Sequence, residues 1–282
     1  MKKIILSMFC IFLLVGCSTK QENITIKKNN NQETVDLKVG FGLHHIEDGY
    51  SFDGKDVDIN YDYEVVGRDA NFGLIIFING IPQMIKHEDK ESLVYTFKGK
   101  KDTNKTEHVS IMPNTGSKGD HLYMHAFLIA DYEIVDSLKQ LTNKQHMMAC
   151  GTTFIDIHQD TANNPIDLNN NYDLIDYTSD LLKHDDEEGY FDNNLLIQFP
   201  NNLEGNFKKN KPITIKMSGI SDNYILWVLE DLKPVSSYHI ELPKNKSAVL
   251  SYKPGNKTKN VKAIAIPLSS NLPEESTSLV VK

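Results

Sequence analysis

Apolar and polar residues alternate with a period of two along much of the chain. From Asp56 to Val65, apolar side chains at odd positions alternate with acidic or polar side chains at even positions. This pattern predicts a half-buried antiparallel strand with one wet face. The next run, Leu74–Ile78, is apolar at every position and ends at the turn signal Asn79-Gly80, which predicts a strand buried on both faces. Shorter strands are expected at Leu93–Phe97 and His108–Met112.

The same order of patterns recurs about 150 residues later. Ile213–Ser218 alternates, and Ile225–Leu229 is apolar throughout. Strands at Ala248–Tyr252 and Val261–Ile266 complete the second copy, as those at Leu93–Phe97 and His108–Met112 complete the first. Because the parity of apolar and polar positions is kept, we predict a tandem repeat of one β-fold.

Short strands, polar turns and the lack of a long amphipathic helix predict an all-β chain with two tandem immunoglobulin-like β-sandwich domains. Trp227, within its apolar run, looks like the core tryptophan of immunoglobulin-like domains, although the cysteine pair that flanks it there is absent. The likeness describes architecture and assigns no function.

The expected domain boundaries follow from these patterns. Sandwich domain 1 spans 34–157, an irregular acidic linker spans 158–194, and sandwich domain 2 spans 195–282. The linker is polar and contains the acidic run Asp185–Glu188, as linkers between domains commonly do. Part of it, from Tyr172 to Leu182, could form a short helix.

The N-terminus has the pattern of an export signal. Lys2 and Lys3 precede an apolar run from Ile4 to Val15, which is too short to span a bilayer and predicts a signal peptide over 1–16. The segment Leu14-Val15-Gly16-Cys17 resembles the lipobox of bacterial lipoproteins. This resemblance implies cleavage before Cys17 and attachment of lipid, such as palmitate, to its sulfur.

A polar stretch without periodicity follows, and we expect residues 17–33 to form a lipidated N-terminus and a flexible tether. The resemblance to lipoproteins implies a protein anchored by lipid to the extracytoplasmic face of the cell membrane.

Composition excludes one class of partner and one means of stabilisation. The chain has 38 Asp and Glu against 30 Lys and Arg, a net charge of −8, and Arg68 as its single arginine, so it lacks the basic character of a nucleic-acid binder. Of the three cysteines, Cys10 falls in the predicted signal peptide, and the resemblance to lipoproteins implies that Cys17 carries the lipid. Only Cys150 remains, so no intramolecular disulfide is expected, and we interpret this residue as a small buried hydrophobe.

The ten histidines raise the question of metal binding. His121 and His125 lie in an alternating segment that predicts a strand, where residues four apart are roughly 13 Å apart, too far to share one ion. His146 and Met147 suit soft copper only with ligands from elsewhere. These four residues are the candidate ligands, but we assign no metal and expect no cofactor.

The common motifs of enzymes are absent from the sequence: it contains no G-x-S-x-G, GxxxxGK[ST], HExxH or CxxC. We therefore assign no catalytic residue and expect a lipid-anchored, non-catalytic binding or scaffolding module, with another envelope protein or a glycan as partner. Two alternatives stay open. One is a metal-handling lipoprotein that binds Cu or Zn through His and Met, and the other is a hydrolase with an unrecognised site.

Overall fold

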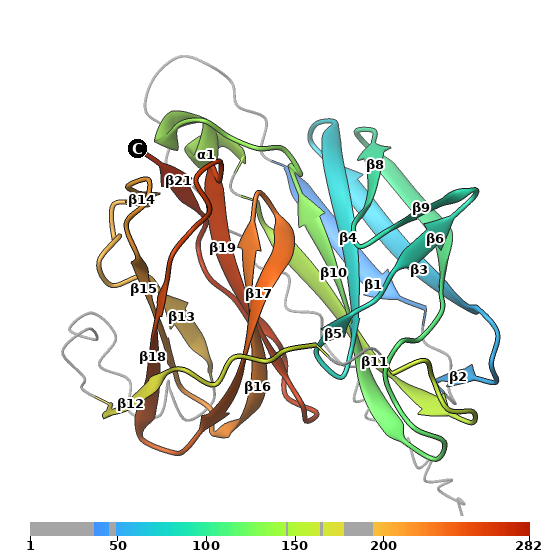
Figure 1. Cartoon of the computed structure of the whole chain (residues 1–282). Coiled ribbons are helices and arrows are strands. Elements are labelled where there is room, and N and C mark those ends of the chain that lie inside the picture. The colour runs from blue at the N-terminus through green and yellow to red at the C-terminus, as the bar shows by residue number, and fades with distance from the viewer. Residues whose placement is uncertain (1–36, 45–48, 145, 164–165, 178–193) are drawn as a thin grey trace, which may run out of the picture. The chain divides into compact units, whose positions relative to one another are not determined.

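The computed structural model describes residues 37–44, 49–144, 146–163, 166–177 and 194–282 (Figure 1). The predicted signal peptide, Cys17, the tether and the acidic run Asp185–Glu188 lie outside the described residues. Thr34–Lys282 forms one compact unit, and the strands among its described residues make four sheets. The predicted all-β fold with two tandem immunoglobulin-like sandwiches is confirmed.

The first sandwich consists of two sheets and one helix. One sheet has the order β1-β3-β9-β6-β7, and the other has the order β2-β11-β10-β4-β5, with β8 also pairing with β4. The helix α1 (Leu138–Lys144) lies in the connection between β10 and β11. The strands are β1 (Lys38–Leu43), β2 (Tyr50–Phe52), β3 (Val57–Val66), β4 (Ala70–Ile78), β5 (Ile81–Pro82), β6 (Ile85–His87), β7 (Lys90–Ser92), β8 (Tyr95–Gly99), β9 (Thr103–Ile111), β10 (His121–Ala130) and β11 (Met148–Ile157).

The second sandwich has sheets of order β12-β18-β15-β13 and β14-β21-β19-β16-β17, with β20 pairing with β19. Its strands are β12 (Asp173–Asp176), β13 (Leu196–Gln198), β14 (Asn206–Phe207), β15 (Ile213–Ser218), β16 (Asp222–Glu230), β17 (Lys233–Leu242), β18 (Lys246–Tyr252), β19 (Asn260–Pro267), β20 (Glu274–Glu275) and β21 (Leu279–Val281).

Each sandwich buries its own core between its two sheets. In β3, Ile59, Tyr61, Tyr63 and Val65 point into the first core, and the even-numbered residues between them point outward, as the alternation predicts. The acidic side of β3 is solvated: Asp56, just before it, pairs with Lys86 at 2.9 Å, and Asp62 accepts a hydrogen bond from Thr106 at 2.5 Å.

The strand pairings show that the two sandwiches repeat one topology. In the first, β3 pairs with β1 and β9, and in the second, β15 pairs with β13 and β18. In the opposite sheets, β4 pairs with β10 as β16 pairs with β19, and the parallel pair β2 with β11 has its counterpart in β14 with β21. The repeat is therefore present at the level of topology.

Two details of the sequence interpretation were wrong. The run at Ala248–Tyr252 lies in β18 and corresponds to β9, and Val261–Ile266 lies in β19 and corresponds to β10. The sequence matching had paired them with runs one strand too early, because the first sandwich carries additional short strands between β4 and β9. Within Tyr172–Leu182, the described residues form the strand β12 rather than a helix, because Asp173–Asp176 pairs antiparallel with β18.

The central strands β4 and β16 are apolar on both faces for two different reasons. Leu74 and Ile76 point into the first core, and Leu226 and Val228 point into the second. The residues between them point outward and belong to a third apolar cluster, to which both sandwiches contribute. The outward faces of the central strands therefore bury a contact between the sandwiches.

Candidate functional site at the junction of the sandwiches

The third apolar cluster, which we call the junction cluster, comes from the outer faces of β4, β10, β16 and β19, with Val94 from the connection between β7 and β8. Its aromatic centre is Phe77, Phe127 and Trp227, with the rings of Phe77 and Phe127 edge to face at 5.6 Å and those of Phe77 and Trp227 6.3 Å apart. The buried members are Ile75, Phe77, Val94, Phe127, Ile129, Ile225, Trp227, Leu229, Ile264 and Ile266.

Trp227 lies in the junction and not in a sandwich core, so the comparison with the immunoglobulin core tryptophan was wrong. Only 5% of it is exposed, and its indole N–H donates a hydrogen bond of 2.7 Å to the carbonyl of Gly80 in the other sandwich. The parity of β16 explains the difference, because Leu226 and Val228 take the inward positions.

Gly80 is required where the sandwiches approach each other. It has φ of 75°, in the left-handed region, within the tight turn between β4 and β5. A Cβ atom at this position would lie 2.5 Å from Cγ1 of Ile225 in the other sandwich. Glycine therefore satisfies both the turn geometry and the close contact.

A polar seam borders the junction cluster along the segment 131–147. The side chain of Asn260 accepts a hydrogen bond of 2.8 Å from the amide of Val135 and donates one of 2.9 Å to the carbonyl of the same residue. Both residues are buried. The pair thus reproduces two backbone hydrogen bonds between segments 125 residues apart, which satisfies polar groups that burial would otherwise penalise.

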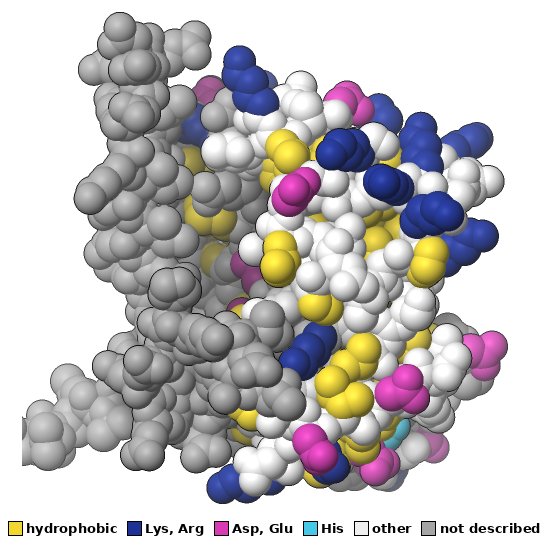
Figure 2. Space-filling view, turned by 90° about the vertical axis from the view of Figure 1, so that its left-hand side faces the viewer, with side chains coloured by type: hydrophobic (Ala, Val, Ile, Leu, Met, Phe, Trp, Pro, Cys, Tyr) yellow, Lys and Arg dark blue, Asp and Glu magenta, His cyan; other side chains and the backbone are white. Residues whose placement is uncertain are grey.

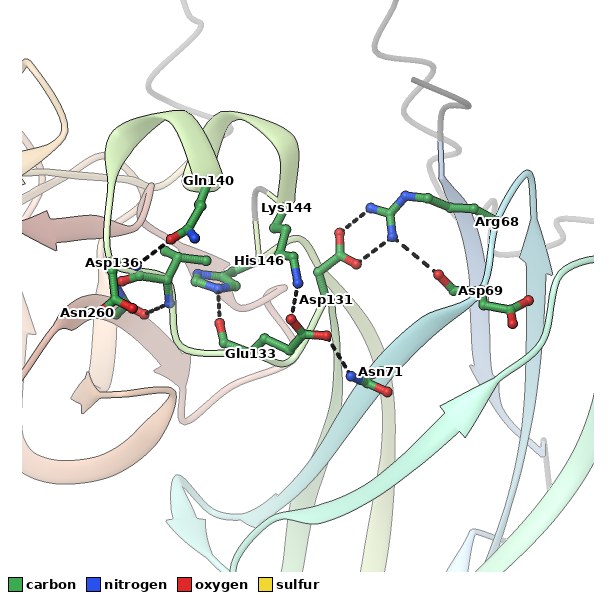
Figure 3. A network of polar contacts seen from close by, with 11 residues as sticks. Arg68, Asp69, Asn71, Asp131, Glu133, Asp136, Gln140, Lys144, His146 and Asn260 are labelled. Atoms are coloured by element: carbon green, nitrogen blue, oxygen red, sulfur yellow. Dashed lines mark hydrogen bonds and ion pairs between the residues drawn. The ribbon is translucent and has the colours of Figure 1, made fainter. Parts of the chain in front are cut away.

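The segment 131–147 is fixed to the first sandwich by one ion pair and by one hydrogen bond to a carboxylate (Figure 3). Arg68 makes a bidentate pair with Asp131, with distances of 2.7 and 2.5 Å, and this pair raises the pKa of the guanidinium. Glu133 accepts hydrogen bonds from Asn71, at 2.6 Å, and from Lys144 in α1. Because Asp131 is buried, a bidentate arginine is the suitable partner for it.

His146 closes the seam from the end of the same segment (Figure 3). Its Nε2 donates to the carbonyl of Glu133 at 2.8 Å, so Nδ1 accepts from the hydroxyl of Ser278 in the second sandwich at 3.2 Å. Burial, together with the positive charge of Lys262, lowers the pKa of His146 to about 4. The ring is therefore neutral at pH 7 and acts as a structural bridge.

A buried ion pair lies beside His146. Lys262, with 3% of its side chain exposed, pairs with Glu275 at 2.7 Å, and Glu275 also accepts a hydrogen bond of 3.2 Å from the amide of Met148 in the first sandwich. The carboxylate of Glu275 thus neutralises the buried charge of Lys262 and also accepts a hydrogen bond from an amide of strand β11.

The structure does not bring the four candidate metal ligands together. His121 starts β10 and bonds to Asp156 at 2.7 Å, whereas His146 and Met147 lie beyond the other end of the β10–β11 pair. His125 is buried between them, with Nδ1 3.0 Å from the hydroxyl of Thr152, and burial lowers its pKa to about 4. Within the described residues, no group of three His, Cys, Asp or Glu side chains is placed to hold a metal ion.

Cys150 packs against the junction cluster as a hydrophobic residue. Burial raises the pKa of its thiol to about 12, which keeps the sulfur protonated at neutral pH. Because the thiolate is the reactive form, this residue is a poor nucleophile.

Two open hollows lie on the second sandwich. The first, of about 500 Å³, is formed where the expected linker passes β17, and it is lined by Asn170, Tyr172, Asp173, Leu174, His239 and Glu241. The second, of about 530 Å³, lies at the end where β15 begins, and its charged lining residues are Glu204, Lys208, Lys211 and Lys282.

The fold is immunoglobulin-like. No protein-family model matches the chain, and no curated protein sequence matches it. Among solved structures, the chain is similar to red sea bream transglutaminase (16% identity, TM-score 0.24), covering 89% of this chain and 32% of that one. It is also similar to the periplasmic chaperone SfaE (12% identity, TM-score 0.22), covering 86% of this chain and 100% of that one. A third similar structure contains fibronectin(III)-like modules of Clostridium thermocellum CbhA (11% identity, TM-score 0.21), with 86% of this chain and 94% of that one covered.

The chain spans about a third of the transglutaminase. Similarities at these identities and TM-scores assign no activity. None of the helices in the described part of the chain is long and apolar enough to cross a membrane.

The residues of the polar seam were not identified from the sequence. Arg68 was noted only as the single arginine, and Asn260 only precedes a predicted strand. The one available signal was the position of the single arginine, which lies next to Asp69 and close to a predicted strand. This position does not indicate Asp131 as its partner.

We expect Trp227→Ala to lower the free energy of unfolding by about 3–5 kcal/mol, because it removes a large side chain from the junction. Trp227→Phe keeps an aromatic ring but leaves the carbonyl of Gly80 unpaired, and it should cost about 1–3 kcal/mol. Denaturant titration measures both. Leu203→Ala is the control, since Leu203 is 76% exposed and its loss should change stability by less than about 0.5 kcal/mol. A Trp227→Ala cost no larger than this control would contradict the assignment.

We expect stability to fall as the pH drops from 6.5 to 5. The folded pKa of His146 is about 4, below the roughly 6.5 of an unfolded histidine, so the unfolded chain binds a proton in this range that the folded chain does not. The stabilisation is complete above the unfolded pKa, and about 1.5 kcal/mol of it should be lost by pH 5. In His146→Gln, the loss over the same range should be smaller by that amount. An unchanged pH dependence of the unfolding free energy would show that His146 is solvated.

Proposed function

We propose that this chain is a lipid-anchored protein of the cell envelope whose tandem sandwiches form a non-catalytic binding or scaffolding module. The anchor rests on the sequence, where a lysine pair, a short apolar run and the lipobox-like Leu14-Val15-Gly16-Cys17 occur in the order typical of bacterial lipoproteins. Several acyl chains on one residue would hold the protein at the membrane surface far more firmly than a single chain.

The non-catalytic part of the proposal is supported by what the reactive side chains do. His146 bridges the two sandwiches through both ring nitrogens, and Arg68 holds the carboxylate of buried Asp131. Cys150 and His125 have pKa values shifted by burial toward their neutral forms. These groups, which could serve as nucleophile, base or anion binder elsewhere, contribute here to packing and to the junction.

The junction also bears on where a partner would bind. The outer faces of β4, β10, β16 and β19 are covered, so a partner would bind elsewhere, and we place it at the sandwich ends and the connecting segments, where loops project. The hollow beside β17 lies on such a connecting segment, and amide, phenol, imidazole and carboxylate groups line it. Its polar lining suits a polar partner such as a glycan or another envelope protein.

Replacement of the lipidated residue tests the anchor. In cells fed labelled palmitate, the wild-type protein should incorporate label and fractionate with membranes, and Cys17→Ala should lose the label and leave the membrane fraction or accumulate uncleaved. Cys150→Ala is the matched control and should behave as wild type, because Cys150 belongs to the junction cluster. Unchanged labelling of Cys17→Ala would overturn the proposal of a lipid anchor.

A further inference from the structure

The described chain begins at a particular end of the first sandwich. Strand β1 starts at Lys38, which pairs with Val66, the last residue of β3. At the same end, Gly99 at the end of β8 pairs with Ala70 at the start of β4, and Ala130 ends β10. We call this the tether end, because the segment that precedes Lys38 joins the fold here.

The tether end continues into one end of the second sandwich. Asn260, which starts β19, bonds to Val135 in the segment that follows β10, and Lys259 pairs with Asp136 at 2.7 Å. Around Lys259, the amide of Val281 bonds to its carbonyl at 2.8 Å. The start of β1 therefore lies at the same side of the compact unit as four points of the second sandwich: the first residues of β15 and β19 and the last residues of β18 and β21.

Lysines gather at this end of the second sandwich. The amide of Lys282 bonds to the carbonyl of Phe207, which places the C-terminal residue beside the segment 208–211. The pairing of Ile213 with Tyr252 brings the segment that follows β18 to the same place. The exposed lysines from these segments, for which the described residues show no ion pair, are Lys208, Lys209, Lys211, Lys253, Lys257 and Lys282.

The negative charges near these lysines are largely engaged. Glu230 accepts hydrogen bonds from Tyr252, Gly255 and Thr258, and Asp231 accepts from the amides of Lys259 and Asn260. These neutral donors hold the carboxylates in place without cancelling their charge, and Glu204 also lines the hollow, so the positive charge here is an excess of lysines over carboxylates. Three of the lysines, Lys208, Lys211 and Lys282, also line the hollow of about 530 Å³.

The opposite end of the same sandwich is more acidic. Figure 2 shows most lysines of this face in its upper part and most acidic side chains in its lower part. Asp222 starts β16 and pairs in register with Leu242, next to Glu241 of the first hollow. The chain is acidic as a whole, with a net charge of −8, so a concentration of lysines at one end is a local feature.

We infer that the tether end of this protein faces a lipid surface with anionic headgroups. The inference rests on the proposed lipid anchor at Cys17. A flexible tether of about 20 residues, as expected between Cys17 and Lys38, would have an end-to-end distance on the order of 25 Å, and the anchor would then hold this end nearest to the membrane. Unpaired lysines within a Debye length of anionic headgroups attract the surface, and the acidic opposite end is repelled by it.

Binding of the fragment 34–282 to vesicles tests this orientation without the lipid. The fragment contains the whole compact unit, with both cores and the junction. It should cosediment with vesicles of phosphatidylcholine containing 40% phosphatidylglycerol at least tenfold better than with phosphatidylcholine alone, and 0.3 M salt should abolish the difference.

Two double variants with equal changes of charge locate the binding surface. Lys208→Glu with Lys211→Glu should weaken binding to the anionic vesicles tenfold or more, and the control, Lys55→Glu with Lys118→Glu, should weaken it less than threefold. All four lysines are exposed, so both variants should unfold as wild type does. Equal loss in the two variants, or equal binding to both kinds of vesicle, would overturn the inference.

A soluble polyanion distinguishes a membrane from another anionic polymer. Inorganic polyphosphate at the same phosphate concentration should bind at least tenfold more weakly than the anionic vesicles, and equal binding would overturn the assignment to a lipid surface. Because the fragment lacks Cys17, these results are independent of palmitate labelling. Failure of the vesicle test therefore leaves the anchor standing, and failure of the labelling test does not change vesicle binding.

Discussion

The structure depends on the burial of one apolar contact between two sandwiches that each have a complete core. Without it, β4 and β16 would expose Ile75, Phe77, Ile225 and Trp227 on their outer faces. Full burial of each large apolar side chain contributes roughly 1.5–3 kcal/mol, so the junction supplies a substantial part of a typical domain stability. An exposed patch of this kind would also promote aggregation.

The polar seam defines the geometry of this contact. An apolar face alone permits several arrangements, but Asn260 must meet the backbone of Val135, and His146 must reach both Glu133 and Ser278. Each of these buried groups would carry a desolvation cost if its partner moved away. The segment 131–147 thus connects the two sandwiches, because Arg68 fixes it to the first and Asn260 fixes it to the second.

Sequence reasoning found the strands because burial follows the period of the side chains. The alternation in β3 and the apolar runs in β4 and β16 were sufficient to predict their place in sandwiches, and the repeat followed from the order of these patterns. The same reasoning treated a strand that is apolar on both faces as central and did not identify what covers its second face. Trp227 was therefore assigned to a core, since period and composition are the same for a core and a junction.

The polar seam was beyond prediction for a different reason. Its long-range contacts join residues about 60 to 130 positions apart, and each depends on a single side chain in a loop or at the first residue of a strand. Such contacts have no periodicity. The proposed N-terminal signal, in contrast, needs no fold to be predicted, because export signals are defined by charge and apolar length along the sequence.

We expect the junction to make the two sandwiches one cooperative unit. Equilibrium unfolding in guanidinium tests this with two probes measured on the same samples. The fluorescence of the single tryptophan reports on the junction, and far-ultraviolet circular dichroism reports on all the strands. Both signals should change in one transition with the same midpoint. A change in Trp227 fluorescence at a lower denaturant concentration, with the strand signal still intact, would contradict it.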